Sequence, residues 1–255
     1  MARASTSSRP RGCTRSTASA VTRSRKENSA RIVSLLPSAT EILFAIGAGD
    51  DIVGVTHECD FPGAARGLPQ LTSSALPASA APAAIDRHVR ESLHAGSSLY
   101  HLDAGLLEQL APDLIVTQEL CDVCTVSYDV VSRAARRLRS DPRVVSLEPS
   151  TLQDVFATIE FLGALTGRET GAQACIGLMR ARLQTLRLRS GKNVSRPLVL
   201  VLEWSDPPMS AGHWIPELIE IAGGEPVLHD RGANSRRLSW DQIADSDPDV
   251  VIVAP

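Results

Sequence analysis

Two cysteines three residues apart, Cys121 and Cys124, lie in the stretch TQELCDVC, directly after an apolar run. A C-x-x-C pair can act as a redox dithiol, form half of a zinc site, or consist of unreactive thiols. Redox pairs usually stand at the start of a helix after the first strand of a domain. This pair follows what we predict to be a third strand. It therefore favours ligand-lining or structural thiols, with a metal site as the alternative.

Three more residues supply thiol or imidazole groups that could join Cys121 and Cys124 around a metal. They are His57 and Cys59 in the stretch HECD, and His213 in the stretch GHW. The metal pattern is weak because zinc sites usually show a second close pair of ligands, and His57-x-Cys59 is a short one. The rival interpretation is a metalloprotein or metal-dependent enzyme that uses this cluster.

Polar and aromatic loops follow several of the predicted strands. In open parallel sheets, ligands bind beyond the carboxyl ends of the strands, so we expect these loops to meet at one edge. The loops supply the candidate ligand-binding residues, which are Pro37, Ser38, His57, Glu58, Cys59, Asp60, Gln118, Glu119, Cys121, Cys124, Glu203, Trp204, Asp206, His213 and Trp214.

Some of these residues have a simpler structural interpretation. Ser38 with Glu41 three residues later forms the pattern of a helix capping box. Trp204 and Trp214 would ordinarily be core residues, but their neighbours are polar, as in EWSD and GHW. An amphipathic ring in such a loop favours stacking on a flat ligand. We therefore expect the two tryptophans to form a ligand platform.

The elements that must position these loops form a regular alternation. Short apolar runs predict strands at 32–36, 52–56, 113–117, 143–147, 198–202 and 249–253. Helical patterns predict helices that follow Ser38 and at 85–95, 103–110, 127–139, 214–222 and 239–245, while 63–84 is expected to be a loop. Such alternation predicts an α/β fold with parallel sheets covered by helices on both faces.

Residues 151–190 break this alternation, because about forty residues of helical pattern, interrupted near Gly167, contain no strand. We expect residues 31–150 to form an N-terminal lobe, 151–192 a helical bridge and 193–255 a C-terminal lobe. The few strands after the bridge predict that this second lobe is truncated.

Composition excludes several classes of protein. The net charge of −3 and the pI near 6.1 do not suggest a nucleic-acid partner. Residues 1–29 are rich in Arg and Ser and carry +6, so we expect a disordered or targeting leader over residues 1–30. That stretch has no apolar core of a secretory signal, and no run of the chain is long enough for a membrane span. Nucleotide-binding and hydrolase motifs are also missing.

Four ordered blocks resemble the cobalamin- and siderophore-type substrate-binding proteins of ABC importers. They are RIVSLLPSATEILFAIGAGDDIVGVTHECDFP, LEQLAPDLIVT, WSDPPMSAGHWIPELIEIAGGEPVL and WDQIADSDPDVVIVAP. The combination of HECD, LCDVC and EWSDPP with GHW is most similar to a cobalamin-binding subgroup. The resemblance implies two Rossmann-like lobes joined by a rigid bridging helix (the class III fold), with one ligand held between them.

The resemblance also implies a function and its partners. We expect a non-enzymatic protein that binds cobalamin or another metal chelate without covalent attachment, as a monomer, with His57 or His213 as a possible axial ligand. An ABC permease is the implied partner, and Glu220 falls where the family places a docking acid, although the matching position in the first lobe is Gly105. Because no secretory signal is evident, we expect a cytoplasmic or organellar location.

Overall fold

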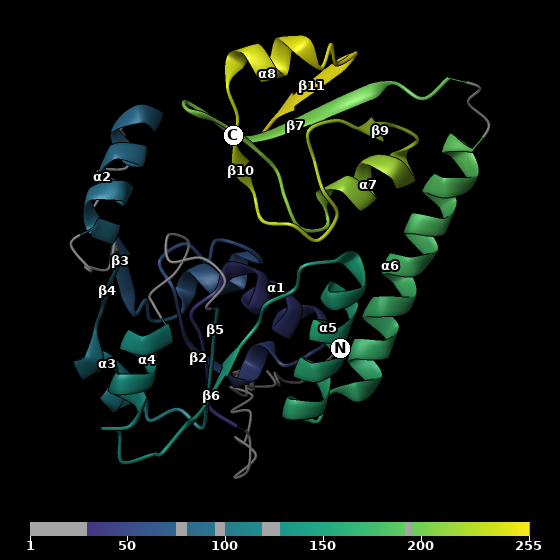
Figure 1. The fold of residues 1–255 in the computed structure, drawn as a ribbon. Helices are drawn as coiled ribbons and strands as arrows, with labels where there is room; N and C mark the ends of the chain where they lie inside the picture. The colour runs from purple at the N-terminus through teal and green to yellow at the C-terminus, as the bar shows by residue number, and fades with distance from the viewer. Residues whose placement is uncertain (1–29, 75–80, 95–99, 119–127, 192–194, 255) are drawn as a thin grey trace, which may run out of the picture.

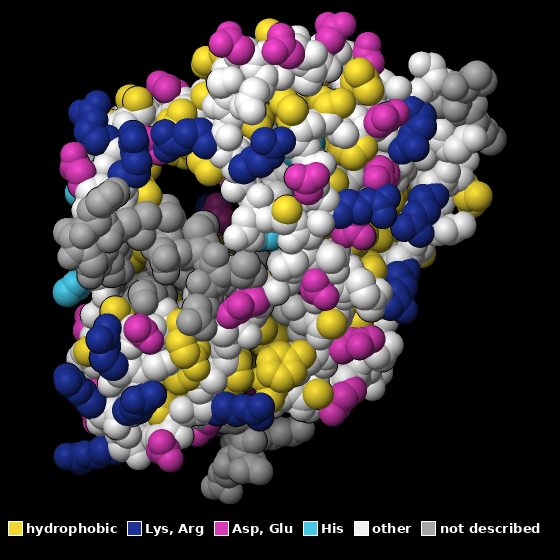
Figure 2. Space-filling view, viewed as in Figure 1, with side chains coloured by type: hydrophobic (Ala, Val, Ile, Leu, Met, Phe, Trp, Pro, Cys, Tyr) yellow, Lys and Arg dark blue, Asp and Glu magenta, His cyan; other side chains and the backbone are white. Residues whose placement is uncertain are grey.

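The computed structural model describes residues 30–74, 81–94, 100–118, 128–191 and 195–254. Two α/β units, each built on its own main sheet, lie one above the other, and a long helix runs along one side of both (Figure 1). We call the unit built on the first sheet lobe one and the unit built on the second sheet lobe two. The space-filling view shows an opening between them on the side away from the long helix (Figure 2).

Lobe one is built on a sheet of parallel strands in the order β2-β1-β5-β6. The strands are β1 (Ile32–Ser34), β2 (Ile52–Val55), β5 (Leu114–Thr117) and β6 (Arg143–Ser146). Each lies within an apolar run of the sequence, and the strands β1 and β5 at the centre of the sheet are fully buried. The prediction of a buried parallel sheet is therefore confirmed for this lobe.

Helices cover both faces of this sheet. Successive residues of β1 point to opposite faces: Ile32 joins a core with Leu43 of α1 (Pro37–Ala45), and Val33 joins a second core with Leu107 and Val131. These last two belong to α3 (Ala104–Leu110) and α4 (Tyr128–Ala135). Short 3₁₀ turns, η1 (Gly49–Asp51) and η2 (Gly63–Gly67), flank β2. Lobe one is thus a doubly covered α/β layer.

The first helix does not use the predicted capping box. Proline at position 37 is the first helical residue and Leu36 is the N-cap, with no side-chain cap. Pro37 favours that early start because its fixed φ suits the first turn and its missing N–H costs nothing there. Ser38 therefore falls inside the first turn and is exposed, so the capping role predicted for it is wrong. The predicted stop at Gly47 is confirmed by its φ of 87°.

A hairpin interrupts the segment predicted to be a long loop. Strands β3 (Thr72–Ser74) and β4 (Tyr100–Leu102) pair antiparallel, and α2 (Pro82–His94) lies between them in the chain. The loop predicted over 63–84 is therefore wrong at β3 and at the start of α2. Three-residue strands of Thr, Ser, Tyr and His are too short and too polar to show a pattern.

The helical bridge consists of two helices. α5 (Leu152–Thr166) ends at Gly167, whose φ is 64°, and α6 (Glu169–Ser190) follows. α5 packs into lobe one through Phe156, Ile159 and Leu162. The part that spans the two lobes is therefore α6, and the predicted interruption near Gly167 is its starting point.

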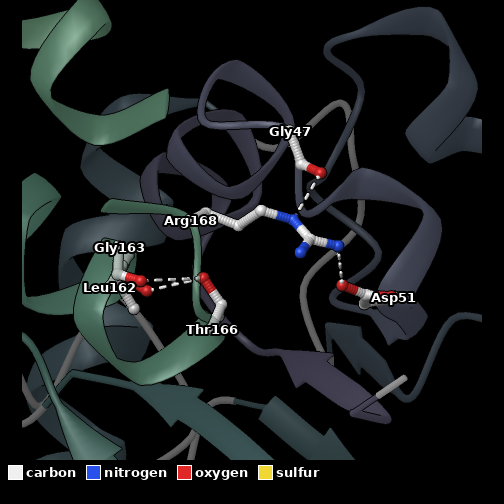
Figure 3. Close-up of polar contacts among 6 residues, drawn as sticks. All are labelled: Gly47, Asp51, Leu162, Gly163, Thr166 and Arg168. Carbon is white, nitrogen blue, oxygen red and sulfur yellow. Dashed lines mark hydrogen bonds and ion pairs between the residues drawn. The ribbon is translucent and has the colours of Figure 1, made fainter. Parts of the chain in front are cut away.

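Arg168, at the elbow between α5 and α6, fastens the bridge to lobe one (Figure 3). Its Nε–H donates to the carbonyl of Gly47 (3.0 Å), and its Nη2 donates to the Asp51 carboxylate (2.9 Å). The Asp51 side chain is only 9% exposed. Because a buried carboxylate without a partner is costly, this pair fixes the elbow against the residues that follow α1.

Lobe two is built around a long central strand, β7 (Leu198–Ser205). It pairs in parallel with β9 (Glu225–Pro226) and β11 (Val250–Val253), and antiparallel with β8 (Pro208–Ser210), which pairs with β10 (Arg236–Arg237). The expected parallel core is present, and β8 and β10 extend it with antiparallel strands. β8 follows β7 after only two residues, so a hairpin connects them.

Two helices accompany this sheet. α7 (Ile215–Ala222) ends at Gly223 in the left-handed conformation, and α8 (Trp240–Asp245) starts with the predicted capping box of Ser239 and Gln242. The apolar side chains of β11 remain 41–54% exposed. None of the helices in the described ranges is both long and apolar enough to span a bilayer.

The seat of α6 on lobe one depends on Gly171. A Cβ at this position would collide with the backbone carbonyl of Ile46, which a side-chain movement cannot relieve. Gly177 lies further along the same helix and is exposed, and a Cβ there would meet nothing within 4 Å. Gly171 thus lies in the tightly packed first turn of α6, whereas Gly177 lies in the exposed interior of the same helix.

We expect opposite effects from alanine at these two positions. Gly177→Ala should raise the free energy of unfolding by about 0.5–1 kcal/mol, because alanine is the better helix former. Gly171→Ala should lower it by about 1–3 kcal/mol, because overpacking outweighs that gain. Urea unfolding followed by circular dichroism measures both, and an equal gain in the two variants would contradict the close approach at Ile46.

Candidate functional site

The carboxyl-end loops of lobe one face the loops of lobe two. The backbone N–H of Leu152, just beyond the loop after β6, donates to the Glu217 carboxylate of α7 (2.7 Å). A Cβ built on Gly232 of lobe two would lie 3.6 Å from Thr151 and 3.9 Å from the Ser150 carbonyl. Since β2, β1 and β5 are neighbours, the loops that carry the predicted site residues lie along this same edge.

His57 is held by threonines at the end of β2. Its Nδ1 lies 2.7 Å from Thr72 Oγ1, and its backbone N–H donates to the same oxygen (3.1 Å). Thr72 Oγ1 also lies 2.8 Å from Thr56 Oγ1. Because Nδ1 is committed to Thr72, Nε2 is the ring nitrogen that remains to meet a ligand. The half-buried ring is thus oriented before any ligand binds.

Glu58 and Tyr100 extend this arrangement. The Tyr100 hydroxyl donates to Glu58 Oε1 (3.2 Å), and its ring lies 5.7 Å from that of His57. Burial, together with the nearby Glu58 carboxylate, raises the pKa of Tyr100 to about 12. The hydroxyl therefore stays protonated at neutral pH and remains a donor. Glu58 itself is exposed and retains acceptor capacity for a ligand.

The next part of the turn is exposed to solvent. The Asp60 side chain is 78% exposed and lies 3.9 Å from Arg66, whose Nε–H also donates to the Asp60 carbonyl (2.8 Å). Phe61 is 62% exposed, which is unusual for a large apolar ring. Asp60 and Phe61 therefore form an accessible polar and aromatic part of the turn that follows His57.

Cys59 does not face a ligand. Its side chain is 2% exposed within the core of lobe one, and Sγ lies 3.1 Å from Thr40 Oγ1, which donates to Ser34 Oγ (2.8 Å). Burial raises the pKa of the Cys59 thiol, so the thiolate that a metal would need is disfavoured. The thiol lies in the core beneath the HECD turn, against the prediction that it lines the ligand site or binds a metal.

Other predicted residues of lobe one are only partly accounted for. Pro37 and exposed Ser38 begin α1 beyond the carboxyl end of β1, and half-buried Gln118 follows β5 directly. Glu119, Cys121 and Cys124 lie outside the described residues. Within the described ranges, no group of three or more His, Cys, Asp or Glu side chains could hold a metal ion.

Trp204 lies near the carboxyl end of β7, next to Met209 of β8 in the hairpin register. Its indole N–H donates to the carbonyl of Asp206 (2.9 Å), while Glu203 and Asp206 are exposed. The turn thus uses the only polar group of the indole. What the half-buried ring can offer a ligand is therefore its face, as stacking requires.

His213 has a strained backbone and an unpaired ring atom. Its φ is 56°, in the left-handed region that residues other than glycine rarely adopt. Its N–H donates to the Ala233 carbonyl (2.7 Å) and its carbonyl accepts from Gly232 (3.0 Å). Nδ1 is buried and has no partner in the described part of the chain. Such strain and an orphaned polar atom are features that cluster at functional sites.

Trp214 has a second role besides the predicted platform. Its ring lies 5.9 Å from that of His213, but it also packs against the hydrophobic core that α5 and α6 share with lobe one. Trp214 is the N-cap residue of α7. Its position therefore joins the His213 loop to the junction between the lobes.

His229, which the sequence did not single out, supports the other side of this loop. Its Nε2 accepts from the Val201 N–H (2.9 Å), and its Nδ1–H donates to the Ala211 carbonyl (2.7 Å). Burial lowers the pKa of His229, the Ala211 bond opposes this, and Arg236 adds to the lowering. The neutral ring thus connects β7 to the residues directly before Gly212 and His213.

The sequence matches a known protein family and a known protein over most of its length. A family model described as periplasmic binding protein matches residues 32–255. The vitamin B12-binding protein of Vibrio cholerae is 23% identical over 234 residues, which cover 88% of this chain and 70% of that protein.

Two solved structures have a similar fold. The periplasmic vitamin B12 binding protein BtuF of Vibrio cholerae is 21% identical, with a TM-score of 0.63 over 89% of this chain and 76% of that one. The periplasmic heme-binding protein RhuT from Roseiflexus sp. RS-1 is 22% identical, with a TM-score of 0.64 over 89% and 76% of the two chains. At these identities the likeness shows the two-lobed fold itself.

These findings correct the predicted location. The matched family is described as periplasmic, and both similar structures are of periplasmic proteins. The expected cytoplasmic or organellar location is therefore wrong. That expectation depended on the composition of residues 1–29. These residues lie outside the matched range of 32–255, so their composition does not contradict the family match.

We expect His229 to make the stability of the protein depend on pH. Its folded-state pKa is lowered, so the unfolded chain binds more protons as pH falls. The stabilisation is fully present above the unfolded pKa, near 6.5, and is lost as pH falls through the folded pKa, with a slope of at most about 1.4 kcal/mol per pH unit. Urea unfolding across this range should show a shallower pH dependence in His229→Gln than in wild type, whereas identical slopes would contradict this role.

Proposed function

Because the chain belongs to the periplasmic binding protein family, we propose that it is a substrate-binding protein that holds one corrinoid, or a similar flat metal chelate, between its two lobes. The observation that carries the proposal is that the loops after β2 and β7 supply oriented imidazole, carboxylate and indole groups. We also propose residues 31–150 and 193–255 as the two lobes and 151–192 as the bridge.

Lobe one would supply polar contacts. His57 Nε2, with the ring oriented by Thr72, and the exposed Glu58 carboxylate suit the amide groups at the rim of a corrinoid. Tyr100 donates to Glu58 and borders the His57 ring, so it would position both residues. Asp60 and the exposed ring of Phe61 would complete this side.

Lobe two would supply the flat surface and a second imidazole. The face of Trp204 suits stacking on a macrocycle, because its N–H is already used within the turn. The buried Nδ1 of His213 would gain a hydrogen-bond partner if a polar group of the ligand or a water molecule reached it. One of the two histidines, His57 or His213, would act as the axial ligand of the metal.

An ABC permease is the proposed partner, as the family relationship implies. Glu220 of α7, the proposed docking acid, is 27% exposed, and both of its carboxylate oxygens contact the guanidinium of Arg231. Gly105, at the matching place in lobe one, lies in the first turn of α3 and offers no charge. Lobe two would therefore provide the charged part of the docking surface.

We expect Trp204 to be the main stacking residue. Trp204→Ala should weaken binding of hydroxocobalamin by about tenfold, which is the size of an aromatic stacking contribution. Trp240→Ala is the matched control, because Trp240 is 61% exposed on α8 and has no part in the proposed site. Fluorescence or absorption titration measures both affinities. If wild-type protein shows no binding in the micromolar range, the corrinoid proposal fails, and hemin titrated in the same way tests a porphyrin instead.

The absorption spectrum should reveal the axial ligand. An imidazole bound to cobalt changes the visible bands of hydroxocobalamin, and either His57→Ala or His213→Ala should abolish that change. His101→Ala is the control, since His101 is an exposed histidine on β4. A bound-state spectrum that is the same in all three variants as in wild type would rule out axial ligation by these residues, while leaving stacking intact.

A further inference from the structure

The segment that contains β3, α2 and β4 belongs to lobe one and extends to lobe two. The two strands pair with each other, Thr72 with Leu102 and Ser74 with Tyr100, so that α2 is carried on a hairpin. In Figure 1, α2 stands on the opposite side of the molecule from α6 and rises to the level of lobe two. Elements that reach from one lobe to the other therefore lie on two sides of the molecule. α6 and its elbow join the lobes along the chain, whereas α2 belongs to lobe one and only reaches towards lobe two.

A buried carboxylate makes the contact between α2 and lobe two. Asp86 Oδ1 accepts from Arg237 Nη2 of β10 at 2.7 Å, and Asp86 Oδ2 lies 2.5 Å from Arg90 Nη2. The Asp86 side chain is 11% exposed, whereas Arg237 is 46% exposed and Arg90 54% exposed. A carboxylate withdrawn from water between two guanidinium groups depends on both of them. In Figure 2, basic side chains extend from α2 towards lobe two above the opening.

Both ends of this connection lead to the proposed ligand site. On lobe one, Thr72 of β3 holds His57, and Tyr100 of β4 contacts Glu58. On lobe two, Arg237 pairs with Met209 of β8, and Met209 pairs with Trp204 of β7. Arg237 is thus two strands away from Trp204 in the same row of the sheet. The contact between Asp86 and Arg237 therefore involves elements that adjoin both walls of the proposed site in the chain or in the sheet.

We propose that Asp86, Arg90 and Arg237 form a latch that holds the two lobes closed opposite α6 and slows release of the bound ligand. The effect on ligand release rests on the proposed function, whereas the closure itself does not. The latch would be strongest in dilute salt, since its arginines are half exposed and therefore partly screened. Breaking it leaves Asp86 in contact with Arg90 alone, within a single helix.

The closure is tested in ligand-free protein by hydrogen exchange and mass spectrometry. Arg237→Gln should speed amide exchange in peptides that contain α2 or β10 by about twofold to fivefold, the effect of losing one partly exposed ion pair. Peptides from β1 and β5 should not change. Arg231→Gln is the matched control, because Arg231 pairs with Glu220 inside lobe two. Unchanged exchange in α2 and β10 would overturn the latch.

A charge exchange separates the ion pair from a general loss of structure. Arg237→Asp should open the latch further than Arg237→Gln, because it places two carboxylates together. The triple variant Asp86→Arg/Arg90→Gln/Arg237→Asp restores an attractive pair across the lobes with reversed polarity, and it should return the exchange rates towards wild type. Failure of this rescue would also count against the latch.

Release of hydroxocobalamin, followed by stopped-flow absorption, tests the functional part. The dissociation rate should rise by about twofold to fivefold in Arg237→Gln, and the triple variant should reverse the rise. If hydroxocobalamin does not bind to wild-type protein while the exchange results hold, the proposed ligand fails and the latch stands. If it binds and leaves at the same rate in all variants, the latch has no role in ligand retention.

Discussion

The close approach between the α6 backbone and the end of α1 is the contact on which the two-lobed arrangement depends. Gly171 lies directly against the Ile46 carbonyl, and Arg168, one turn earlier, binds the next carbonyl along and Asp51. At the other end of α6, the Ser190 hydroxyl donates to the Ile221 carbonyl of α7 (2.9 Å). The helix is therefore fixed at both ends by contacts with backbone carbonyl groups, and at Gly171 the approach leaves no room for a side chain.

The hydrophobic core follows from this seat. The larger core of lobe one includes Phe156 and Ile159 of α5 and Ile176 of α6, and it continues to Ile221 and Trp214 of lobe two. One contiguous apolar cluster thus crosses the junction, and Glu217 adds a polar contact to the first turn of α5. A hinge built in this way resists large rotations, because opening it would expose apolar surface to water. Small adjustments of the lobes are the motion that remains.

Much of this architecture is readable from the sequence, since buried parallel strands appear as short apolar runs. β1, β5 and β7 fall where those runs predict them, and the capping box at Ser239 is a local pattern that tertiary contacts do not override. All four residues of HECD are predicted ligand-binding residues. Cys59 instead turns into the core, and the direction of a side chain in a turn depends on contacts with residues such as Thr40, which lie far away in sequence.

Other parts of the site were beyond sequence reasoning for the same reason. Thr72 and Tyr100 belong to strands of three residues that show no periodicity, and their link to His57 exists only after the hairpin folds. His229 is a single histidine in a polar loop, and nothing near it in sequence indicates that it bonds to Val201 and Ala211. Longer-range pairing decides each of these roles.

The pairing of Glu220 with Arg231 has a consequence for recognition. If the permease proposed as partner presents an arginine to Glu220, that arginine would find the carboxylate already occupied by a guanidinium from the same lobe. Docking would then exchange one arginine partner for another, so the number of ion pairs at Glu220 stays the same. The hydration that the released Arg231 gains would be offset by the hydration that the incoming arginine loses, so most of the favourable free energy of the encounter would have to come from the surrounding surface. Such an exchange would favour a readily reversible contact, because Arg231 belongs to the same lobe and can pair with the Glu220 carboxylate again.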